Sequence, residues 1–278
     1  MRAESSKIIF FDIDGTLIDI TGIVSSNLME ALLKLKANGH EICLATGRSE
    51  DGQITKFRKM NWDGYILGNG VYGEYKGDIV MHETMPDQDI EEFVKFTNAM
   101  SEMGIILEGN TGAYTTQAGS QASYQAMKKA AYYREMSYDD FIAYFQVVED
   151  LQAIRDVNKI MYFNGAKYAE AMMSKFDKYL DFLPNSITQS LSLDDGEIMK
   201  KGITKAEGIK KLINYAGYEQ KDVIAFGDGY NDIEMIEFAA IGVAMGNGVE
   251  QLKESADIVA DRLENDGIVK ILKQLKLI

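Results

Sequence analysis

The chain begins with a run of apolar residues that stops at two acidic ones. Four consecutive apolar residues at 8–11 are typical of a buried strand in a parallel sheet that is covered on both faces. Asp12, Ile13, Asp14 and Gly15 follow, and the alternation of side chains along a strand places the two aspartates on the same side. Gly15 can adopt the backbone angles of a bend. Because open α/β sheets bind ligands beyond the carboxyl ends of their strands, the acidic pair lies where such folds place their ligand-binding and catalytic residues.

The first 80 or so residues alternate between patterns typical of strands and helices. Apolar positions at helical spacing between residues 28 and 35 predict an amphipathic helix. Further strands are predicted at 41–45 and 65–67, and a hairpin at 71–81. The order strand, helix, strand implies parallel neighbours that are joined by a right-handed crossover.

The middle of the chain has a different character. From about residue 84, predicted strands and helices mix without acidic residues at the strand ends, and from residue 202 the earlier rhythm returns. We therefore predict an α/β fold, with a doubly wound, Rossmann-like parallel sheet as its core and an inserted α+β cap domain. The predicted domains are a core of residues 1–84 and 188–278 and a cap of residues 85–187.

Composition narrows the possible functions. The 278 residues carry a net charge of −14, which disfavours nucleic acid as a partner because such binding depends on basic side chains. No apolar run approaches the roughly 20 residues of a membrane span, and residues 1–7 lack the apolar core of a signal peptide, so we expect a cytoplasmic protein without a membrane partner. The single Cys43 excludes an intrachain disulfide, and the two histidines, His40 and His82, argue against a histidine triad or a zinc site. Nothing in the sequence fixes an oligomeric state.

The acidic pair belongs to a recognisable motif. Asp12-Ile13-Asp14-Gly15-Thr16 resembles Asp-x-Asp-Gly-Thr, the nucleophile motif of the haloacid dehalogenase-like superfamily, whose members are mostly phosphatases. The resemblance implies that Asp12 attacks phosphorus to give an aspartyl-phosphate, which water then hydrolyses. It implies that Asp14 protonates the leaving alcohol and then activates the water.

A second acidic segment implies a metal. Residues 227–232, Gly-Asp-Gly-Tyr-Asn-Asp, resemble the fourth motif of the superfamily, Gly-Asp-x-x-Asn-Asp. The resemblance implies a Mg²⁺ site made by Asp228, Asp12 and the backbone carbonyl of Asp14, with Asp232 supporting the metal directly or through water. Mg²⁺ is a hard cation that favours oxygen ligands, and it offsets the repulsion between carboxylates and a phosphate ester. Asn231 of the same motif is a candidate for contacting the phosphate or orienting a ligand.

Several small residues after the second and third predicted strands complete the phosphate site. Thr46 matches the second motif of the superfamily, a hydroxyl that donates to the phosphoryl oxygens. Gly47 and the amide of Ile13 would allow close backbone approach to the phosphate. Arg48 and Asn69 are candidates for binding substrate, although a surface arginine and a simple Asn-Gly turn explain them equally well.

The third motif is a lysine that holds the nucleophile and the phosphate. The segment Gly-Ile-Thr-Lys at 202–205 resembles Gly-Val-Ser-Lys of related sequences and selects Lys205, with Lys201 as the alternative. Ala206 replaces the glycine that usually follows this lysine.

The position of the insertion separates subfamilies. An α/β insertion after the third strand resembles the class II, subclass B cap of the Cof-type phosphatases, as does the segment Met-Gly-Asn-Gly at 245–248. The resemblance implies a Mg²⁺-dependent phosphatase for a small phosphorylated metabolite, either a sugar phosphate or a cofactor phosphate. The alternatives are a sugar phosphomutase, a phosphate-accepting regulatory protein and a binding protein that has lost turnover. Asp14 and the insertion argue against a receiver domain, which has neither.

Overall fold

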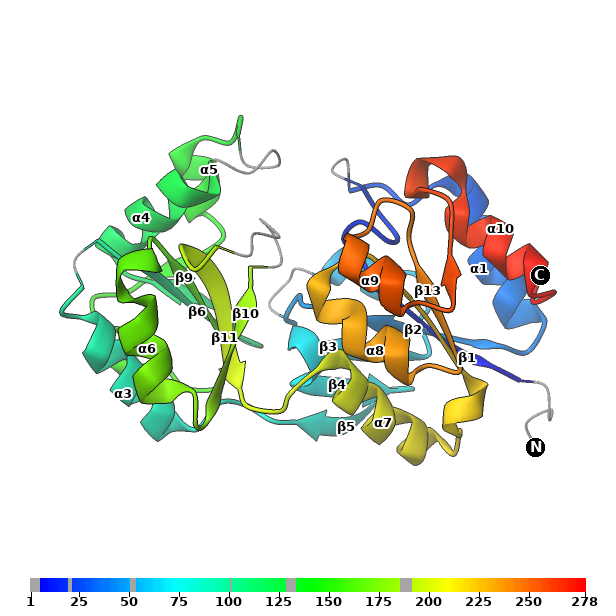
Figure 1. Ribbon diagram of the computed structural model, residues 1–278, viewed down its shortest axis with the longest axis horizontal. Helices are drawn as coiled ribbons and strands as arrows, with labels where there is room; N and C mark the ends of the chain where they lie inside the picture. The colour runs from blue at the N-terminus through cyan, green and yellow to red at the C-terminus, as the bar shows by residue number, and fades with distance from the viewer. Residues whose placement is uncertain (1–5, 20–21, 51–53, 101, 129–133, 186–191) are drawn as a thin grey trace. The chain divides into compact units, whose positions relative to one another are not determined.

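The computed structural model describes residues 6–19, 22–50, 54–100, 102–128, 134–185 and 192–278. The chain divides into two compact units, and both are drawn in Figure 1. The first unit contains Met1–Arg48, Lys56–His82 and Thr204–Ile278. The second unit contains Ser49–Thr55 and Glu83–Ile203.

The first unit is built around a mostly parallel sheet. Among its described residues, eight strands lie in the order β14-β13-β12-β1-β2-β3-β4-β5. The parallel strands are β1 (Ile8–Phe11), β2 (Glu41–Ala45), β3 (Gly64–Leu67), β12 (Val223–Gly227), β13 (Ile241–Ala244) and β14 (Ile258–Val259). The hairpin of β4 (Tyr72–Tyr75) and β5 (Asp78–His82) extends the sheet in the antiparallel sense. The predicted doubly wound sheet is confirmed, and β1 lies inside it between β12 and β2.

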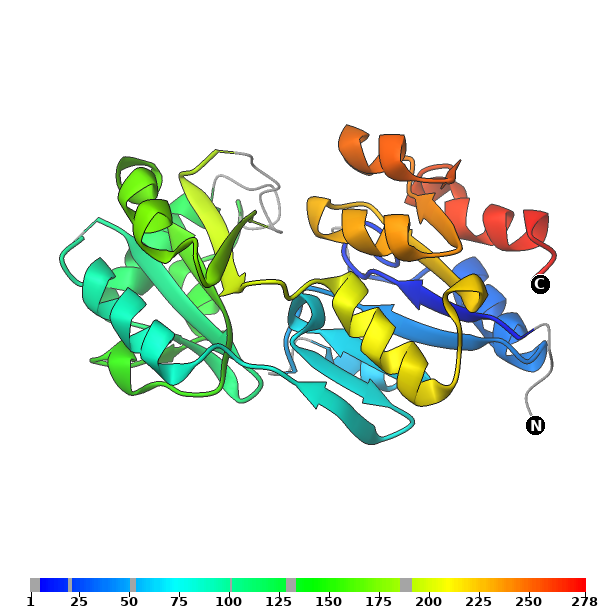
Figure 2. The same ribbon diagram turned by 60° about the horizontal axis from the view of Figure 1, so that its bottom comes forward.

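Helices cover both faces of this sheet, as Figure 2 shows from a second direction. One layer consists of α7 (Lys205–Ala216), α8 (Ile233–Phe238) and α9 (Glu250–Ser255). The other consists of α1 (Ser26–Ala37) and α10 (Gly267–Gln274). The short helix α2 (Thr55–Arg58) lies where the chain returns to the first unit.

The helix α1 illustrates how local sequence produces these elements. Its N-cap is Ser25, whose side chain accepts a hydrogen bond from the backbone N–H of Leu28. Leu28, Ala31, Leu32 and Leu35 recur at helical spacing and are all buried. The helix predicted from that spacing is confirmed, because a single apolar stripe packs against the sheet.

The core between the sheet and the layer of α7, α8 and α9 is apolar. Ile8 and Phe10 from β1 and Cys43 from β2 pack there with Ile209 and Met235 from the helices. Burial raises the pKa of the Cys43 thiol well above its ordinary value, so this cysteine stays protonated and behaves as a small core residue.

The second unit is an α+β domain with a sheet of its own. Among its described residues, six strands lie in the order β10-β11-β9-β6-β7-β8. The strands are β6 (Gly104–Gly109), β7 (Gly112–Thr115), β8 (Gln146–Val147), β9 (Val157–Phe163), β10 (Leu180–Pro184) and β11 (Asp195–Lys200). The helices are α3 (Asp87–Thr97), α4 (Gln117–Met127), α5 (Tyr138–Ile142) and α6 (Ala169–Phe176). Residues of α3 and α6 form one apolar cluster with the sheet, and residues of α4 and α5 form another.

The division of the chain differs from the boundaries that we expected from sequence. The second unit continues to Ile203, whereas the sequence pattern assigned residues from 188 onward to the core. The reason is β11, which pairs with β9 and β10 of the second sheet. Ser49–Thr55 also belongs to this unit. The apolar pattern of a strand shows that it is buried but not which sheet it joins.

Candidate active site

A buried carboxylate at the carboxyl end of β1, that of Asp12, contacts the buried side chain of Lys205. Asp12 follows Phe11 directly, and the residue is 6% exposed. Lys205 is the first residue of α7 and is 1% exposed. Its Nζ lies 2.6 Å from Asp12 Oδ1 and 2.5 Å from Asp232 Oδ1. A single ammonium group therefore joins the ends of β1 and β12 to the start of α7.

The start of α7 is fixed by its own cap and by a close glycine. The Thr204 side chain caps the helix by accepting a hydrogen bond from the backbone N–H of Glu207. Gly70 has a φ of +110°, and a Cβ at this position would lie 2.1 Å from the carbonyl oxygen of Thr204. Only glycine permits this approach, which places Lys205 at the carboxyl edge of the sheet.

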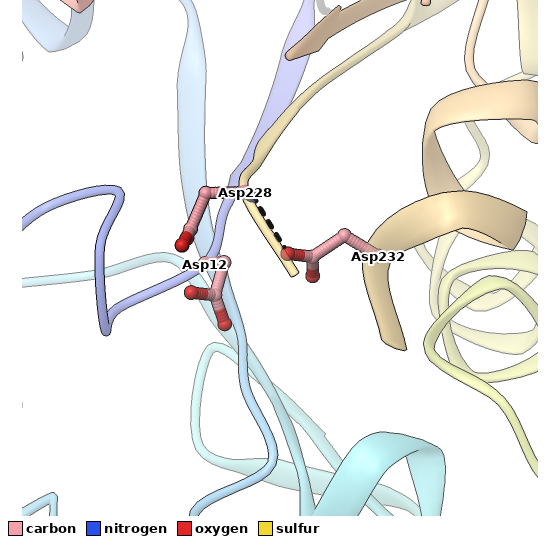
Figure 3. Close-up of side chains that lie close together, drawn as sticks. All are labelled: Asp12, Asp228 and Asp232. Atoms are coloured by element: carbon pink, nitrogen blue, oxygen red, sulfur yellow. Dashed lines mark hydrogen bonds between the residues drawn. The ribbon is translucent and has the colours of Figure 1, made fainter. Parts of the chain in front are cut away.

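Three carboxylates converge at this edge, as Figure 3 shows for Asp12, Asp228 and Asp232. One oxygen of each lies within 4.8 Å of the others, and all three residues are buried. Asp228 follows β12, and its Oδ1 accepts a hydrogen bond of 2.8 Å from Thr16 Oγ1. Asp232 Oδ2 accepts hydrogen bonds of 2.9 Å from the backbone N–H groups of Asp228 and Gly229.

The protonation equilibria reflect this crowding. Burial raises the pKa of Asp12 to about 7; the Lys205 ammonium opposes this rise, and the carboxylates of Asp232 and Asp14 add to it. Burial and the neighbouring Asp12 and Asp232 also raise the pKa of Asp228. Burial alone would lower the pKa of Lys205, but Asp12 and Asp232 raise it above the ordinary value. The Lys205 ammonium contacts only two of these three buried carboxylates, so the cluster has an excess of negative charge when ionised.

This donor set fits a magnesium ion. Carboxylate oxygens are the ligands that hard divalent cations prefer, and a cation would balance the excess charge. Within the described part of the chain, the second oxygens of Asp12 and Asp228 accept no hydrogen bond, whereas both oxygens of Asp232 are engaged. The first two residues therefore have oxygens to offer a metal, and Asp232 is committed to Lys205 and to the backbone after β12.

Asp14 lies apart from the carboxylate cluster and is paired with Arg48. The Asp14 side chain is 57% exposed and is not part of the group of three. Arg48 Nε donates to Asp14 Oδ2 at 2.8 Å, and its Nη2 donates to Oδ1 at 2.6 Å. Arg48 is therefore more than a surface arginine, because a two-pronged ion pair holds it to the expected acid and base.

The remaining expected residues follow β2 and β3. Thr46 is 1% exposed, and its Oγ1 accepts a hydrogen bond from the backbone N–H of Arg48. Asn69 is 2% exposed, has a φ of +56° and accepts a hydrogen bond of 2.9 Å from Asn231 Nδ2. A Cβ on Gly47 would lie 3.0 Å from Asn69 Oδ1, so these residues adjoin one another.

The structure separates the two candidate lysines. The side chain of Ile13 is fully buried in the core of the first unit, and the approach of its backbone amide to the phosphate stays a prediction. The alternative lysine, Lys201, belongs to the second unit, and its Nζ donates to the backbone carbonyl of Asp177. Lys205 alone of the two candidate lysines joins the carboxylates.

The chain resembles a family of known proteins. A family model described as haloacid dehalogenase-like hydrolase matches residues 9–272. The chain belongs to this family. The resemblance and the enzyme class expected from the motifs are therefore confirmed, as is the α/β core with an inserted cap.

Relatives resemble this hydrolase along its whole length. YkrA of Bacillus subtilis (strain 168), which carries the name of a phosphatase, is 28% identical over 273 residues, covering 98% of this chain and 99% of YkrA. YitU of the same organism, a 5-amino-6-(5-phospho-D-ribitylamino)uracil phosphatase, is 26% identical over 277 residues and covers 96% of each chain. The solved structure of BT4131, a sugar phosphatase of HAD subclass IIB, has a TM-score of 0.78 and 27% identity, covering 98% of this chain and 100% of that one.

Sequence reasoning missed two polar residues of the hydrolase site. Thr16 is fully buried and donates to Asp228, and the signal that could have revealed it was its place as the last residue of the first motif. Asn247 Nδ2 donates to the carbonyl oxygen of Gly15. It lies in the Met-Gly-Asn-Gly segment, but no local pattern indicates its partner.

In the described part of the chain, no helix combines the length and apolar character needed to cross a membrane.

Proposed function

We propose that the protein is a Mg²⁺-dependent phosphatase that hydrolyses a small phosphorylated metabolite, a sugar phosphate or a cofactor phosphate, through an aspartyl-phosphate on Asp12. The observation that carries the proposal is the convergence of the buried residues Asp12, Asp228 and Asp232 at the carboxyl ends of parallel strands, where Lys205 bonds to two of them. A location in the cytoplasm stays a prediction.

The contacts of Asp12 suit it to be the nucleophile. Lys205 Nζ holds Asp12 Oδ1, which restricts rotation of the carboxylate and so fixes the direction of both of its oxygens. In the proposed first step an Asp12 oxygen bonds to phosphorus while the ester P–O bond breaks, and Asp14 gives its proton to the leaving alcohol. In the second step water attacks the same phosphorus, Asp14 accepts a proton from it, and inorganic phosphate and free Asp12 are formed.

The proposed metal ligands are Asp12, Asp228 and the backbone carbonyl of Asp14. Bound Mg²⁺ would neutralise the repulsion between these carboxylates and the phosphate ester. Because both oxygens of Asp232 already accept hydrogen bonds, we assign it the role of holding Lys205 and the backbone after β12. Thr46, Asn231 and the backbone at Gly47 are the proposed contacts to the phosphoryl oxygens, and Arg48 and Asn69 hold Asp14 and Asn231 in place.

The names of the relatives support a small phosphorylated substrate. YitU is named for a phosphorylated ribitylamino compound, and BT4131 is a sugar phosphatase. In both, the phosphate is on a small hydroxyl-rich molecule rather than on a polymer. The same chemistry would also serve a sugar phosphomutase, which returns the phosphate to the substrate instead of releasing it.

Release of inorganic phosphate tests the proposal. Wild-type protein with Mg²⁺ should release phosphate from at least one member of a panel of sugar phosphates, nucleotides, flavin mononucleotide and pyridoxal phosphate. The Asp12→Asn variant should lose the activity, because an amide is not a competent nucleophile. Asp63→Asn is a matched control, since Asp63 lies at the other end of β3 and pairs with Lys36. A tenth of wild-type activity in Asp12→Asn, or isomerised phosphate esters without free phosphate, would contradict the proposal.

A further inference from the structure

Asn247 lies outside the expected catalytic motifs but connects two distant parts of the first unit. Its Nδ2 donates a hydrogen bond of 2.7 Å to the carbonyl oxygen of Gly15, which is 232 residues away in sequence. Its Oδ1 accepts a hydrogen bond of 3.1 Å from the backbone N–H of Leu263. Both ends of the side-chain amide are therefore used, so its orientation is fixed.

Gly15 in turn lies directly against a proposed metal ligand. Its φ is +88°, and a Cβ on this residue would lie 2.1 Å from Asp228 Oδ2. The N–H of Gly15 donates to the carbonyl of Ile18 at 2.8 Å, so Asn247 supplies the second anchor of this glycine. The next residue, Thr16, donates to the other oxygen of Asp228. The position of this backbone therefore sets the position of the Asp228 carboxylate.

The loop that carries Asn247 is attached to the same aspartate from the other side. The backbone N–H of Val249 donates to the carbonyl oxygen of Asp228 at 2.9 Å. A Cβ on Gly248 would lie 3.0 Å from that carbonyl oxygen. The loop after β13 is thus fixed to the end of β12, and the side chain of Asn247 crosses from it to the loop after β1.

We propose that Asn247 is a positioning residue for the magnesium site. It holds Gly15, and through it the neighbouring Asp14 carbonyl, beside Asp228. This inference rests on the proposed Mg²⁺-dependent phosphatase, and it adds a residue that touches none of the reacting groups. Groups that orient metal ligands affect metal affinity even when they make no bond to the metal.

The variant Asn247→Ala tests the role directly. Calorimetric titration with Mg²⁺ should show an affinity about 10–100-fold weaker than that of the wild type. The Mg²⁺ concentration that gives half-maximal phosphate release should rise by the same factor, while the rate at saturating Mg²⁺ changes much less. This split follows because Asn247 positions the ligands and does not take part in the chemistry.

The first unit offers a matched control. Asn38 Nδ2 also donates to a backbone carbonyl, that of Leu277, at 2.7 Å across a similar span of sequence. Asn38→Ala removes the same kind of bond away from the carboxylates, so it should lower thermal stability without changing the Mg²⁺ affinity. An equal loss of affinity in both variants would overturn the proposal, because it would show a general effect of loosening the fold.

A second variant covers the case in which Asn247→Ala does not fold. Leu263→Pro removes the N–H that holds Asn247 Oδ1, and proline suits this first position of a 3-10 helix (Leu263–Asn265) after an extended residue. Leu263→Pro should weaken Mg²⁺ binding less than Asn247→Ala does, because the bond from Asn247 to Gly15 remains. Wild-type Mg²⁺ affinity in every folded variant would overturn the role proposed for Asn247 but would not bear on the proposed function. Absence of Mg²⁺ binding in the wild type would overturn the proposed function as well.

Discussion

Lys205 carries the positive charge that two of the buried carboxylates share. It contacts Asp12 and Asp232, whereas the neighbouring Lys201 lies in the other unit. We expect Lys205→Ala to lower phosphate release by about 10²–10³-fold, the scale of losing one preorganised electrostatic contact. Lys201→Ala should retain most of the activity. Steady-state kinetics of the two folded variants makes the comparison, and a larger loss in Lys201→Ala would show that the third motif was assigned to the wrong lysine.

His40 gives a pH dependence of stability that can be measured separately from catalysis. Its Nδ1 accepts a hydrogen bond from the backbone N–H of Lys7 at 3.1 Å. Burial, together with the Lys7 charge, lowers the pKa of His40 below its ordinary value of 6.5. The unfolded chain therefore binds a proton more readily, so the stability from neutral His40 is present above about pH 6.5 and is lost as the pH falls.

The expected outcome is a difference between two proteins. The free energy of unfolding should fall more from pH 7.5 to pH 5.5 in the wild type than in His40→Asn, because asparagine does not titrate. Urea denaturation of both proteins at the two pH values, with chelator present throughout, gives the four free energies of unfolding that are compared. An equal fall in both proteins would show that His40 makes no contribution.

Three adjacent strands of the second sheet bring together a buried charged triad. Lys159 on β9 lies 3.6 Å from Glu108 on β6 and 3.5 Å from Glu197 on β11, and the three side chains are at most 5% exposed. Glu108 Oε1 has no hydrogen-bond partner among the described residues. Ion pairs of this kind lose much of their attraction to desolvation, but removing one member is costly.

Lys159→Met should therefore destabilise the second unit by about 3–5 kcal/mol, because it leaves two carboxylates buried without their cation. Replacing Glu108 and Glu197 by leucine in the same protein should recover most of that loss. Guanidinium denaturation followed by circular dichroism provides the measurement. Equal unfolding midpoints for the wild type and Lys159→Met would mean that the triad is solvated in solution.

The two units have separate hydrophobic cores, which predicts that a metal acts on one of them. The proposed Mg²⁺ ligands all belong to the first unit. A ligand at 100 times its dissociation constant stabilises the folded state by about 2.7 kcal/mol. Mg²⁺ should therefore slow hydrogen exchange at the amides of β1 and β12 and leave those of β6 and β9 unchanged, as mass spectrometry would show.

The Asp228→Asn variant is the control for this experiment. It removes one of the crowded carboxylates, so it should abolish the effect of Mg²⁺ and leave the metal-free first unit at least as stable as the wild type. An equal slowing of exchange in β6 and β9 would contradict the assignment of the metal to the first unit.

Chelation should also abolish phosphate release, and addition of Mg²⁺ should restore it.

Local sequence patterns were enough to predict the first helix and several strands and to locate the motif residues. Two local patterns, the apolar run before Asp12 and the apolar stripe of α1, show which side of each segment is buried. The aspartates at the ends of β1 and β12 could be placed at one edge because parallel strands carry their carboxyl ends to the same side of the sheet.

Which distant groups meet is visible only in the folded chain. The pairing of Arg48 with Asp14, of Asn247 with Gly15 and of β11 with the second sheet joins segments whose local sequences carry no sign of one another. The physical reason is that periodicity reveals which face of an element is buried, whereas the partner is chosen by packing of the whole chain. The proposed catalytic and metal-binding residues could thus be predicted from the motifs, but the residues that position their side chains and backbone could not.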